Sequence, residues 1–500
     1  MTGFKWCLQP GFAILLILAL GQVAQAEETA KESEVGRLVA AMLGGTPLED
    51  DLRDLTTSIG GRATGSAANL ASVDWALGRF ESAGVPATKD AFEMPELWLE
   101  RSATARIRSR NGIVDFAARA AAMPFSTAAP APGITAPLVD AGRGTRKDFA
   151  QLGDSAAGAF LLVEMEPLLD IEGLFREYNE AFDLELRAVD ANAAGVVYMS
   201  SRAEGILYRH NSSLRGDQAR PMLVLDRGAA QRAFELLRAG AALSLTATLE
   251  LETGPAYESY NVIGEIRGFE DPDEVVIVGA HLDSWDLGDG ALDNGANVVL
   301  LIDLARQIKR LGITPRRTIR FALWNGEEQG LLGSYGYTRS HASELDRHVV
   351  AISFDIGCGR INGFFTGGRP EVSPVLERVL EPVAGLGPFA LIDAPVVGTD
   401  NYDFMMQGVA NLIGNHETAT YGPNYHAQSD RFAECDITSL RLNAAIVAAV
   451  TWGFAATDVP WTRQSRADVQ ALIDSTDLER QMRVFNVWDQ WLDGSRGRSE

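Results

Sequence analysis

The chain has 500 residues, 46% of them hydrophobic, and a formal net charge of −23 at pH 7. A single hydrophobic core usually stops growing at about 250–300 residues, so this length predicts at least two folded units. The acidic balance excludes nucleic acid as a partner, because phosphate binding needs clustered Lys and Arg side chains.

Residues 1–26 have the pattern of an export signal. Lys5 precedes an apolar run over residues 12–20, and a small-residue stretch ends at Ala26. The pattern predicts a cleaved signal peptide and an exported protein, periplasmic or extracellular. An uncleaved anchor is the alternative, but the run is shorter than the ~20 residues that span a bilayer. No later segment is expected to span, so no stable membrane association is predicted once the signal is removed.

The middle of the chain predicts a second domain inserted into the first. Ala, Pro, Ser and Thr accumulate around residues 120–133, which indicates a crossing between domains. Short apolar runs alternate with helical patterns after this point and predict a smaller β-rich domain. The predicted order after the signal is an opening part of the main domain (27–130), the insert (131–255), the catalytic part (256–490) and a frayed polar tail (491–500).

The main domain has the sequence pattern of an α/β fold. After Tyr260, apolar strands alternate with amphipathic helices, which predicts a mostly parallel central sheet covered by helices on both faces. Residues 275–280 form a continuous apolar run typical of a buried strand, and residues 295–311 carry a helical apolar stripe. Residues 318–324 and 349–354 predict two further strands.

Polar side chains follow these strands where each one ends. They are His281, Asp293, Glu327, Glu328 and Asp355. Ligands of open α/β sheets bind at the carboxyl ends of the strands. A hydrolytic two-zinc site needs about five imidazole and carboxylate ligands, and a free carboxylate serves as base.

Each of these signals also has a structural explanation when it is taken alone. His281 could belong to a capped turn, and the acidic loop 283–293 could be solvated, although its spacing is not that of a calcium loop. Glu327 and Glu328 could be charges in a first helical turn. Their joint order at successive strand ends favours a metal site.

Five sequence motifs resemble the co-catalytic zinc exopeptidases, a family that includes carboxypeptidase Q, bacterial leucyl aminopeptidases and glutamate carboxypeptidase. The order and spacing of the motifs agree with the family over roughly residues 260–455, and the sequence HLDSWD is most similar to carboxypeptidase Q. The motifs are GAHLDSWD (279–286), LDNGA (292–296), FALWNGEEQGLLGS (321–334), SFDIG (353–357) and YHAQSD (425–430).

The resemblance implies a role for each residue. Asp293 would bridge two zinc ions, His281 and Asp355 would complete one site, and Glu328 and His426 the other. Glu327 would stay unligated as the general base that activates a water between the metals. Asp283 and Asp430 resemble carboxylates that orient the two ligand histidines.

Several positions keep alternatives. His416 could replace His426 as the last ligand, although only His426 is followed by an aspartate four residues on. The tyrosine that stabilises the oxyanion in parts of the family is absent from its usual place, and Tyr425 is the replacement candidate, with packing at the pocket wall as its other explanation. Residues 398–401 form either a specificity loop or a helix start capped by Thr399 or Asp400.

Two further segments carry looser resemblances. Residues 131–255 resemble the protease-associated insert of these enzymes, which would restrict access to the cleft. Residues 61–66 resemble the family's opening motif, and a glycine-rich turn is the alternative. Cys7 leaves with the signal, and two buried free thiols are favoured over a disulfide between Cys358 and Cys435.

The resemblance implies an exported zinc metallo-exopeptidase, an aminopeptidase or dipeptidase acting on peptides. A glutaminyl cyclase-like acyltransferase with one zinc and a non-catalytic binding module of the same fold are the competing functions. The complete ligand set argues against both. Relatives are often dimeric, so a homodimer stays open. Cobalt or manganese would also suit these ligands.

Overall fold

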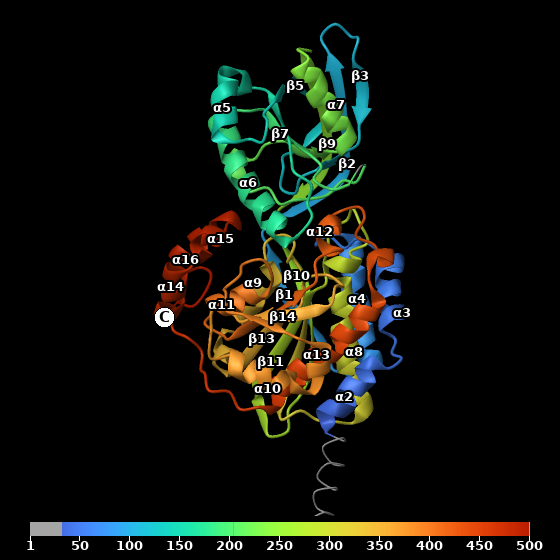
Figure 1. The fold of residues 1–500 in the computed structure, drawn as a ribbon, viewed down its shortest axis with the longest axis vertical. Coiled ribbons are helices and arrows are strands. Elements are labelled where there is room, and N and C mark those ends of the chain that lie inside the picture. Colours follow the sequence, from blue (N-terminus) through green and yellow to red (C-terminus); the bar gives the residue numbers. More distant parts are fainter. Residues whose placement is uncertain (1–32, 204, 500) are drawn as a thin grey trace, which may run out of the picture.

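The computed structural model describes residues 33–203 and 205–499, which form two lobes with one eight-stranded sheet each (Figure 1). The predicted signal peptide, residues 1–26, lies outside the described residues. The lower lobe in Figure 1 contains both ends of the described chain, and the upper lobe is formed by the middle of the sequence. The chain thus leaves the lower lobe, forms the upper one and returns.

The lower lobe has the predicted α/β architecture. Its central strands β12, β11, β13 and β16 run parallel, and antiparallel neighbours flank them. The sheet order is β1 (Ala87–Met94), β10 (Tyr257–Ile266), β12 (Arg317–Trp324), β11 (Asp271–His281), β13 (His348–Ser353), β16 (Asn411–His416), β14 (Ile361–Phe365) and β15 (Ala390–Ile392).

Helices cover both faces of this sheet because successive residues of its strands point to opposite sides. In β11, Val276 and Val278 pack with the larger core, whereas Val275 and Ile277 face a second cluster. The helices on the larger core are α2 (Glu34–Leu43), α3 (Leu48–Asp54), α4 (Ala67–Ser82), α8 (Ala296–Leu311), α10 (Ser373–Leu380) and α13 (Ile437–Ala456). Those on the opposite face are α9 (Leu332–Ser340) and α11 (Asn401–Met406).

Helix α13 is long and apolar enough to cross a membrane, the one such helix found among the described residues. This differs from the sequence expectation that no later segment could span. Most of the helix is buried in the core against α2 and α8, so its apolar character is accounted for by packing.

The upper lobe starts earlier in the chain than predicted. Its strand order is β3 (Asp115–Ala118), β2 (Leu97–Ser109), β9 (Leu243–Gly254), β5 (Ala129–Asp140), β6 (Phe160–Val163), β7 (Gly195–Met199), β8 (Met222–Leu225) and β4 (Ala120–Ala122). The predicted boundary at residue 131 left β2, β3 and β4 in the opening part of the main domain. Strand β2 joins this sheet because it pairs with β9 along its whole length, a long-range contact without a local signal.

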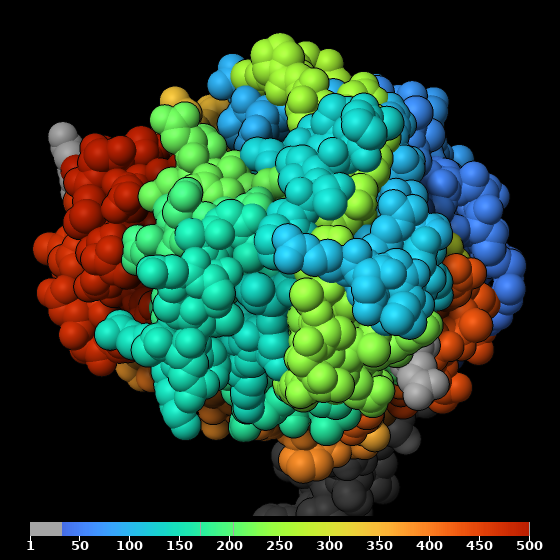
Figure 2. All heavy atoms as spheres, turned by 90° about the horizontal axis from the view of Figure 1, so that it is seen from above, coloured from blue at the N-terminus to red at the C-terminus, as the bar shows by residue number. Residues whose placement is uncertain are grey.

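Three helices cover the sheet of the upper lobe: α5 (Arg146–Leu152), α6 (Ile171–Asp190) and α7 (Arg227–Arg238). The C-terminal helices α14 (Arg466–Ser475), α15 (Leu478–Val484) and α16 (Trp488–Leu492) lie beside both lobes. Viewed from above, this red segment adjoins the cyan and green upper lobe, and Arg480 of α15 donates to Asn179 and Asp183 of α6 (Figure 2).

The tail is docked rather than frayed over residues 491–499. Arg496 is buried, and its guanidinium pairs with Asp403 at 2.7 Å and donates to the main-chain carbonyls of Gly330 and Leu331. A buried cation with a carboxylate partner holds this polar segment against the main domain. Its polar composition alone had indicated a solvated end.

The two cysteines of the described chain form a disulfide, contrary to the free thiols that were favoured. Cys358 and Cys435 have Cα atoms 5.4 Å apart and are 77 residues apart in sequence. Cys358 lies in the loop after β13, and Cys435 lies just before α13. The two segments converge because both line the carboxyl edge of the same sheet.

Candidate metal centre

The structure brings His281, Asp293, Glu328, Asp355 and His426 together at the carboxyl edge of the parallel strands. His281 ends β11, and the two acidic residues Glu328 and Asp355 follow β12 and β13. Asp293 comes from the loop between β11 and α8, and His426 from the loop after β16. All five side chains are buried.

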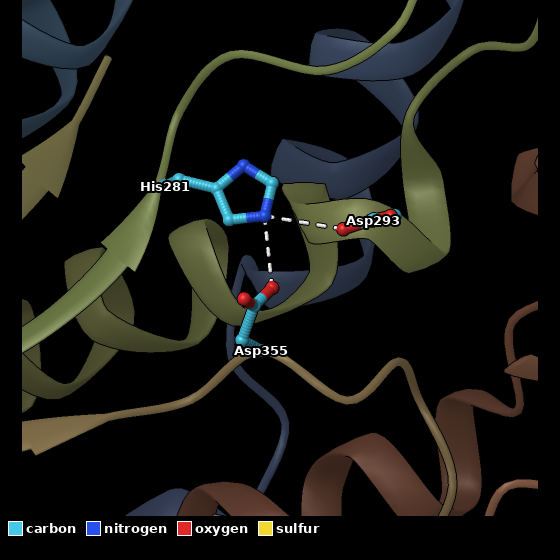
Figure 3. A group of neighbouring side chains, drawn as sticks. All are labelled: His281, Asp293 and Asp355. Atoms are coloured by element: carbon cyan, nitrogen blue, oxygen red, sulfur yellow. Dashed lines mark hydrogen bonds and ion pairs between the residues drawn. The ribbon is translucent and has the colours of Figure 1, made fainter. Parts of the chain in front are cut away.

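One half of the centre consists of His281, Asp293 and Asp355 (Figure 3). Nε2 of His281 lies 2.8 Å from Oδ1 of Asp355 and 3.1 Å from Oδ1 of Asp293. The other imidazole nitrogen, Nδ1, lies 3.0 Å from the main-chain oxygen of Asp283, so Nε2 is the nitrogen available to a metal.

The other half consists of Asp293, Glu328 and His426, so Asp293 is common to both. Nε2 of His426 lies 2.8 Å from Oε2 of Glu328 and 3.4 Å from Oδ2 of Asp293. The two groups therefore share one carboxylate that presents one oxygen to each side, which is the geometry a bridging ligand requires.

The residues fit a pair of zinc ions. Oδ2 of Asp293 and Oε2 of Glu328 are buried and accept no hydrogen bond, although Nε2 of His426 lies close to both. Buried carboxylate oxygens without donors are costly unless a cation neutralises them. Imidazole nitrogens together with carboxylate oxygens are a donor set that zinc accepts.

Glu327 lies beside the centre without belonging to either ligand group. One of its carboxylate oxygens is 4.0 Å from Nε2 of His281. Burial raises the pKa of Glu327 well above its usual value, and the nearby charges of Asp355 and Asp400 add to the effect. A carboxylate with a raised pKa next to a metal site is suited to accept and return a proton.

Asp283 supports the centre through the opening segment of the chain. Its Oδ2 accepts a hydrogen bond from the Thr64 hydroxyl at 2.8 Å, and Thr64 also accepts from the N–H of Gly326. The Asp283 carboxylate itself is 3.7 Å from the His281 ring, and the closer partner of the ring is the Asp283 carbonyl.

Arg62 is a supporting residue to which sequence reasoning assigned no role. Its fully buried guanidinium donates to the carbonyls of Leu282, Asp289 and Gly290. These hydrogen bonds hold the loop that leads to Asp293. The preceding Gly61 lies so close to this loop that a Cβ atom would come within 2.6 Å of the Asp286 Cα. The glycine-rich segment 61–66 was the available signal.

Asp430 has a different partner from the one that the motif implied. Its carboxylate accepts the N–H groups of Ala291, Leu292 and Asp293 at 3.0, 2.7 and 3.1 Å. Burial and the charge of Asp293 raise its pKa to about 8. Asp430 therefore fixes the loop that carries Asp293, whereas the His426 ring is held by the main-chain oxygen of Arg209 at 3.3 Å.

His416 lies outside both ligand groups. Its Nδ1 bonds to the Gly359 carbonyl at 3.1 Å, and burial lowers its pKa to about 4. The structure thus places His426, and not His416, with the other candidate ligands.

Tyr425 stacks on the His426 ring, with centroids 3.6 Å apart, and its hydroxyl lies 2.8 Å from the hydroxyl of Tyr178. Tyr178 comes from α6 of the upper lobe and carried no sequence signal. Burial raises the pKa of both phenols well above 10, so both keep their protons and can donate hydrogen bonds.

Asp400 is a further buried acid near the centre. It precedes α11, but its carboxylate makes no capping bond, and neither of its oxygens has a hydrogen-bond partner. Burial raises its pKa well above the usual value. Its position fits the predicted helix start, and its neighbours Gly398 and Thr399 line the pocket described next.

An apolar cavity of about 150 Å³ opens beside Asp355 and Tyr425. The upper lobe contributes one wall of it from α6, and the C-terminal segment contributes Phe485. The remaining lining residues that are apolar or aromatic are Ile356, Phe365, Val396, Ile413 and Tyr421.

Comparison with known proteins finds similarity that is centred on the lower lobe. Residues 261–451 match the model of peptidase family M28. Carboxypeptidase Q from Xenopus laevis is 32% identical over 222 residues, which are 44% of this chain and 47% of that protein. Leupeptin-inactivating enzyme 1 from Streptomyces exfoliatus is 29% identical over 240 residues, 44% of this chain and 54% of that enzyme. The chain thus spans about half the length of these curated relatives.

Solved structures extend the similarity to both lobes. A peptidase M28 precursor from Shewanella amazonensis SB2B has a TM-score of 0.76 at 26% identity and covers 85% of this chain and 96% of its own. The zinc aminopeptidase BSAP from Bacillus subtilis has a TM-score of 0.64 at 23% identity, with coverage of 81% and 93%. The second likeness shows a shared fold.

Proposed function

We propose, from the premise that residues 261–451 form a domain of peptidase family M28, that this chain is a zinc-dependent exopeptidase. The observation that carries the proposal is the pair of ligand groups that share Asp293, with Glu327 free beside them. The names of its relatives, a carboxypeptidase and a zinc aminopeptidase, support peptide bonds as the substrate.

Two bound zinc ions would lower the pKa of water and polarise the peptide carbonyl. The chain would hold one ion with His281 and Asp355 and the other with Glu328 and His426, and Asp293 would join them. Glu327 would take the proton of the attacking water and return it to the leaving amine.

The phenol of Tyr425 is the proposed donor to the oxyanion that forms at the attacked carbonyl, and the Tyr178 hydroxyl would donate to the oxygen of Tyr425. Replacing Tyr425 by Phe is expected to lower kcat by about 10²–10³-fold, the usual effect of removing one such donor. Tyr178→Phe is expected to have a smaller effect, because its hydroxyl acts through Tyr425. Steady-state kinetics with unchanged zinc content would check both, and an unaltered kcat in Tyr425→Phe would remove tyrosine from the mechanism.

The cavity beside the centre favours a short peptide with an apolar side chain. Its volume of about 150 Å³ holds one side chain, and the α6 helix and Phe485 close it on two sides. This enclosure supports cleavage at a chain end rather than within a long substrate. A single methylene in such a pocket is worth about 10–200-fold in kcat/KM, so Leu should be preferred over Ala by at least tenfold.

A panel of free dipeptides and peptides blocked at either end tests the proposal. Hydrolysis that a block at the N-terminus abolishes would establish an aminopeptidase, and dependence on a free C-terminus would establish a carboxypeptidase. A requirement for both ends would establish a dipeptidase. No cleavage across the panel by a zinc-loaded protein would instead favour a cyclase-like acyltransferase or a binding module.

Export is proposed as well. The signal pattern of residues 1–26 predicts it, and the Cys358–Cys435 disulfide supports it, because disulfides persist in oxidising compartments.

A further inference from the structure

A loop of the upper lobe runs antiparallel to the segment that carries the metal ligand His426. Tyr208 and Ala427 form a bridge between the two. The N–H of Arg209 donates to the His426 carbonyl at 2.9 Å, and the N–H of Gln428 donates to the Leu207 carbonyl at 3.0 Å. The insert and the metal loop are therefore joined by a short two-stranded ladder, called here the seam (residues 207–209 and 425–428).

The seam also fixes the imidazole ring of His426. Nδ1 of the ring lies 3.3 Å from the carbonyl oxygen of Arg209, which can only accept a hydrogen bond. Nδ1 must therefore carry the proton, and Nε2 keeps its lone pair toward Glu328 and Asp293. The orienting group of this ligand comes from the inserted domain, 217 residues away in sequence.

His426 needs such support because its backbone is strained. Its φ angle is +55°, in the left-handed region that side chains other than Gly rarely adopt. That conformation is unfavourable for a residue with a side chain and persists where the surrounding structure imposes it. The seam bonds hold the carbonyl and the ring of this residue at the same time.

A buried ion pair anchors the insert side to the same segment. The Arg202 guanidinium donates twice to the Tyr425 carbonyl, at 3.1 and 2.9 Å, and pairs with Glu177 of α6 at 3.3 Å. The side chain of Arg202 is fully buried and that of Glu177 is 5% exposed. Arg209 adds a bond across the lobes to Asp286 at 2.7 Å.

We propose that the inserted domain is a structural part of the metal centre, and that Arg202 and Arg209 are positioning residues for His426. The insert then does more than restrict access to the cleft, because the half of the centre formed by Glu328 and His426 depends on it. Among the described residues, the side-chain hydrogen bonds of His281 and Asp355 go to Asp283, to Asp293 and to each other, and none goes to the seam. The inference rests on the proposed zinc site for its metal, but the seam itself is present without one.

The test uses the full chain with Arg202→Met and Glu177→Gln combined, so that no unpaired buried charge remains. Arg187→Met is the matched control, because Arg187 also donates to a main-chain carbonyl, that of Gly144, within the insert. Zinc affinities are measured by competition with a chromophoric chelator. Amide exchange of residues 424–428 is measured in the metal-free protein, where zinc has no influence.

The double variant is expected to bind one zinc as the parent does and the second about 10–100-fold more weakly, with faster amide exchange over 424–428. Arg202→Lys, which restores one donor and the charge, should recover part of the lost affinity, and Arg187→Met should behave as the parent. Equal affinities and exchange in the double variant and the parent would overturn the proposal. Equal loss of both zincs would also overturn it, because the effect would then act on the whole fold.

The zinc-affinity and amide-exchange measurements distinguish a failure of this proposal from a failure of the proposed function. A parent chain that binds no zinc would refute the zinc exopeptidase, whereas the exchange measurement would still decide whether the ion pair holds the His426 segment.

Discussion

Glu327→Gln is expected to lower kcat by about 10²–10⁴-fold while the protein keeps its zinc, because the variant loses a general base and no ligand. The amide has the size of the carboxyl group but cannot take a proton from water. The measurement is kcat for a cleaved dipeptide, with zinc per chain determined on the same samples.

Glu81→Gln is the matched control, since Glu81 lies exposed on α4 away from the centre, and its kcat should equal that of the parent. A variant at Glu327 that retained more than a tenth of the parent activity would show that another group takes the proton. Asp400 would be the first residue to examine, because it is buried near Glu327 without hydrogen-bond partners.

Removal of zinc by a chelator is expected to abolish hydrolysis and to lower Tm, and zinc added back should restore both. Ligand binding at 1,000 times Kd stabilises a protein by about 4 kcal/mol, which corresponds to a Tm shift of about 6 °C for a lobe of about 300 residues. The physical reason is the cluster of buried carboxylates that the cations neutralise.

The stability lost on zinc removal should grow as the pH rises from 6.5 to 9. Burial raises the pKa of Glu327 and Glu328 in the metal-free fold, so the folded chain retains protons that the unfolded chain releases above about pH 4.5. Unfolding then becomes easier with increasing pH. For His281, burial opposes the charge, but the charge of Asp355 and the hydrogen bonds to Asp293 and Asp355 outweigh it and raise the pKa, so its stabilisation is also lost as the pH rises.

The titration of His426 affects stability only at acidic pH, below the range of 6.5 to 9 in which the prediction is tested. Burial lowers its pKa to about 4, so its effect on stability appears as the pH falls below about 6.5. Thermal unfolding of metal-free and zinc-loaded protein at several pH values above 6.5 checks the prediction. A Tm difference that stayed constant or shrank with pH would contradict it, and magnesium in place of zinc serves as the control ion.

The fold class and the similarity of residues 261–451 to zinc exopeptidases were predictable from sequence, because both depend on local patterns. The apolar run that becomes β11 and the helical stripe of α8 are read from neighbouring residues. His281, Glu328 and Asp355 were also predictable as candidates, since they lie at or just after strand ends and the carboxyl ends of parallel strands meet at one edge. Asp293 and His426 lie farther along their loops, and the resemblance of the motifs indicated them.

Only the tertiary structure decided which partner each of these residues has. The ring of His426 is held by Arg209 and not by Asp430, Tyr178 reaches Tyr425 from another lobe, and Cys358 pairs with Cys435. The pairing of β2 with β9 likewise places the start of the upper lobe earlier in the chain than the predicted boundary at residue 131. Periodicity and spacing report how a segment folds with its neighbours, whereas these contacts depend on where the chain returns after tens to hundreds of residues.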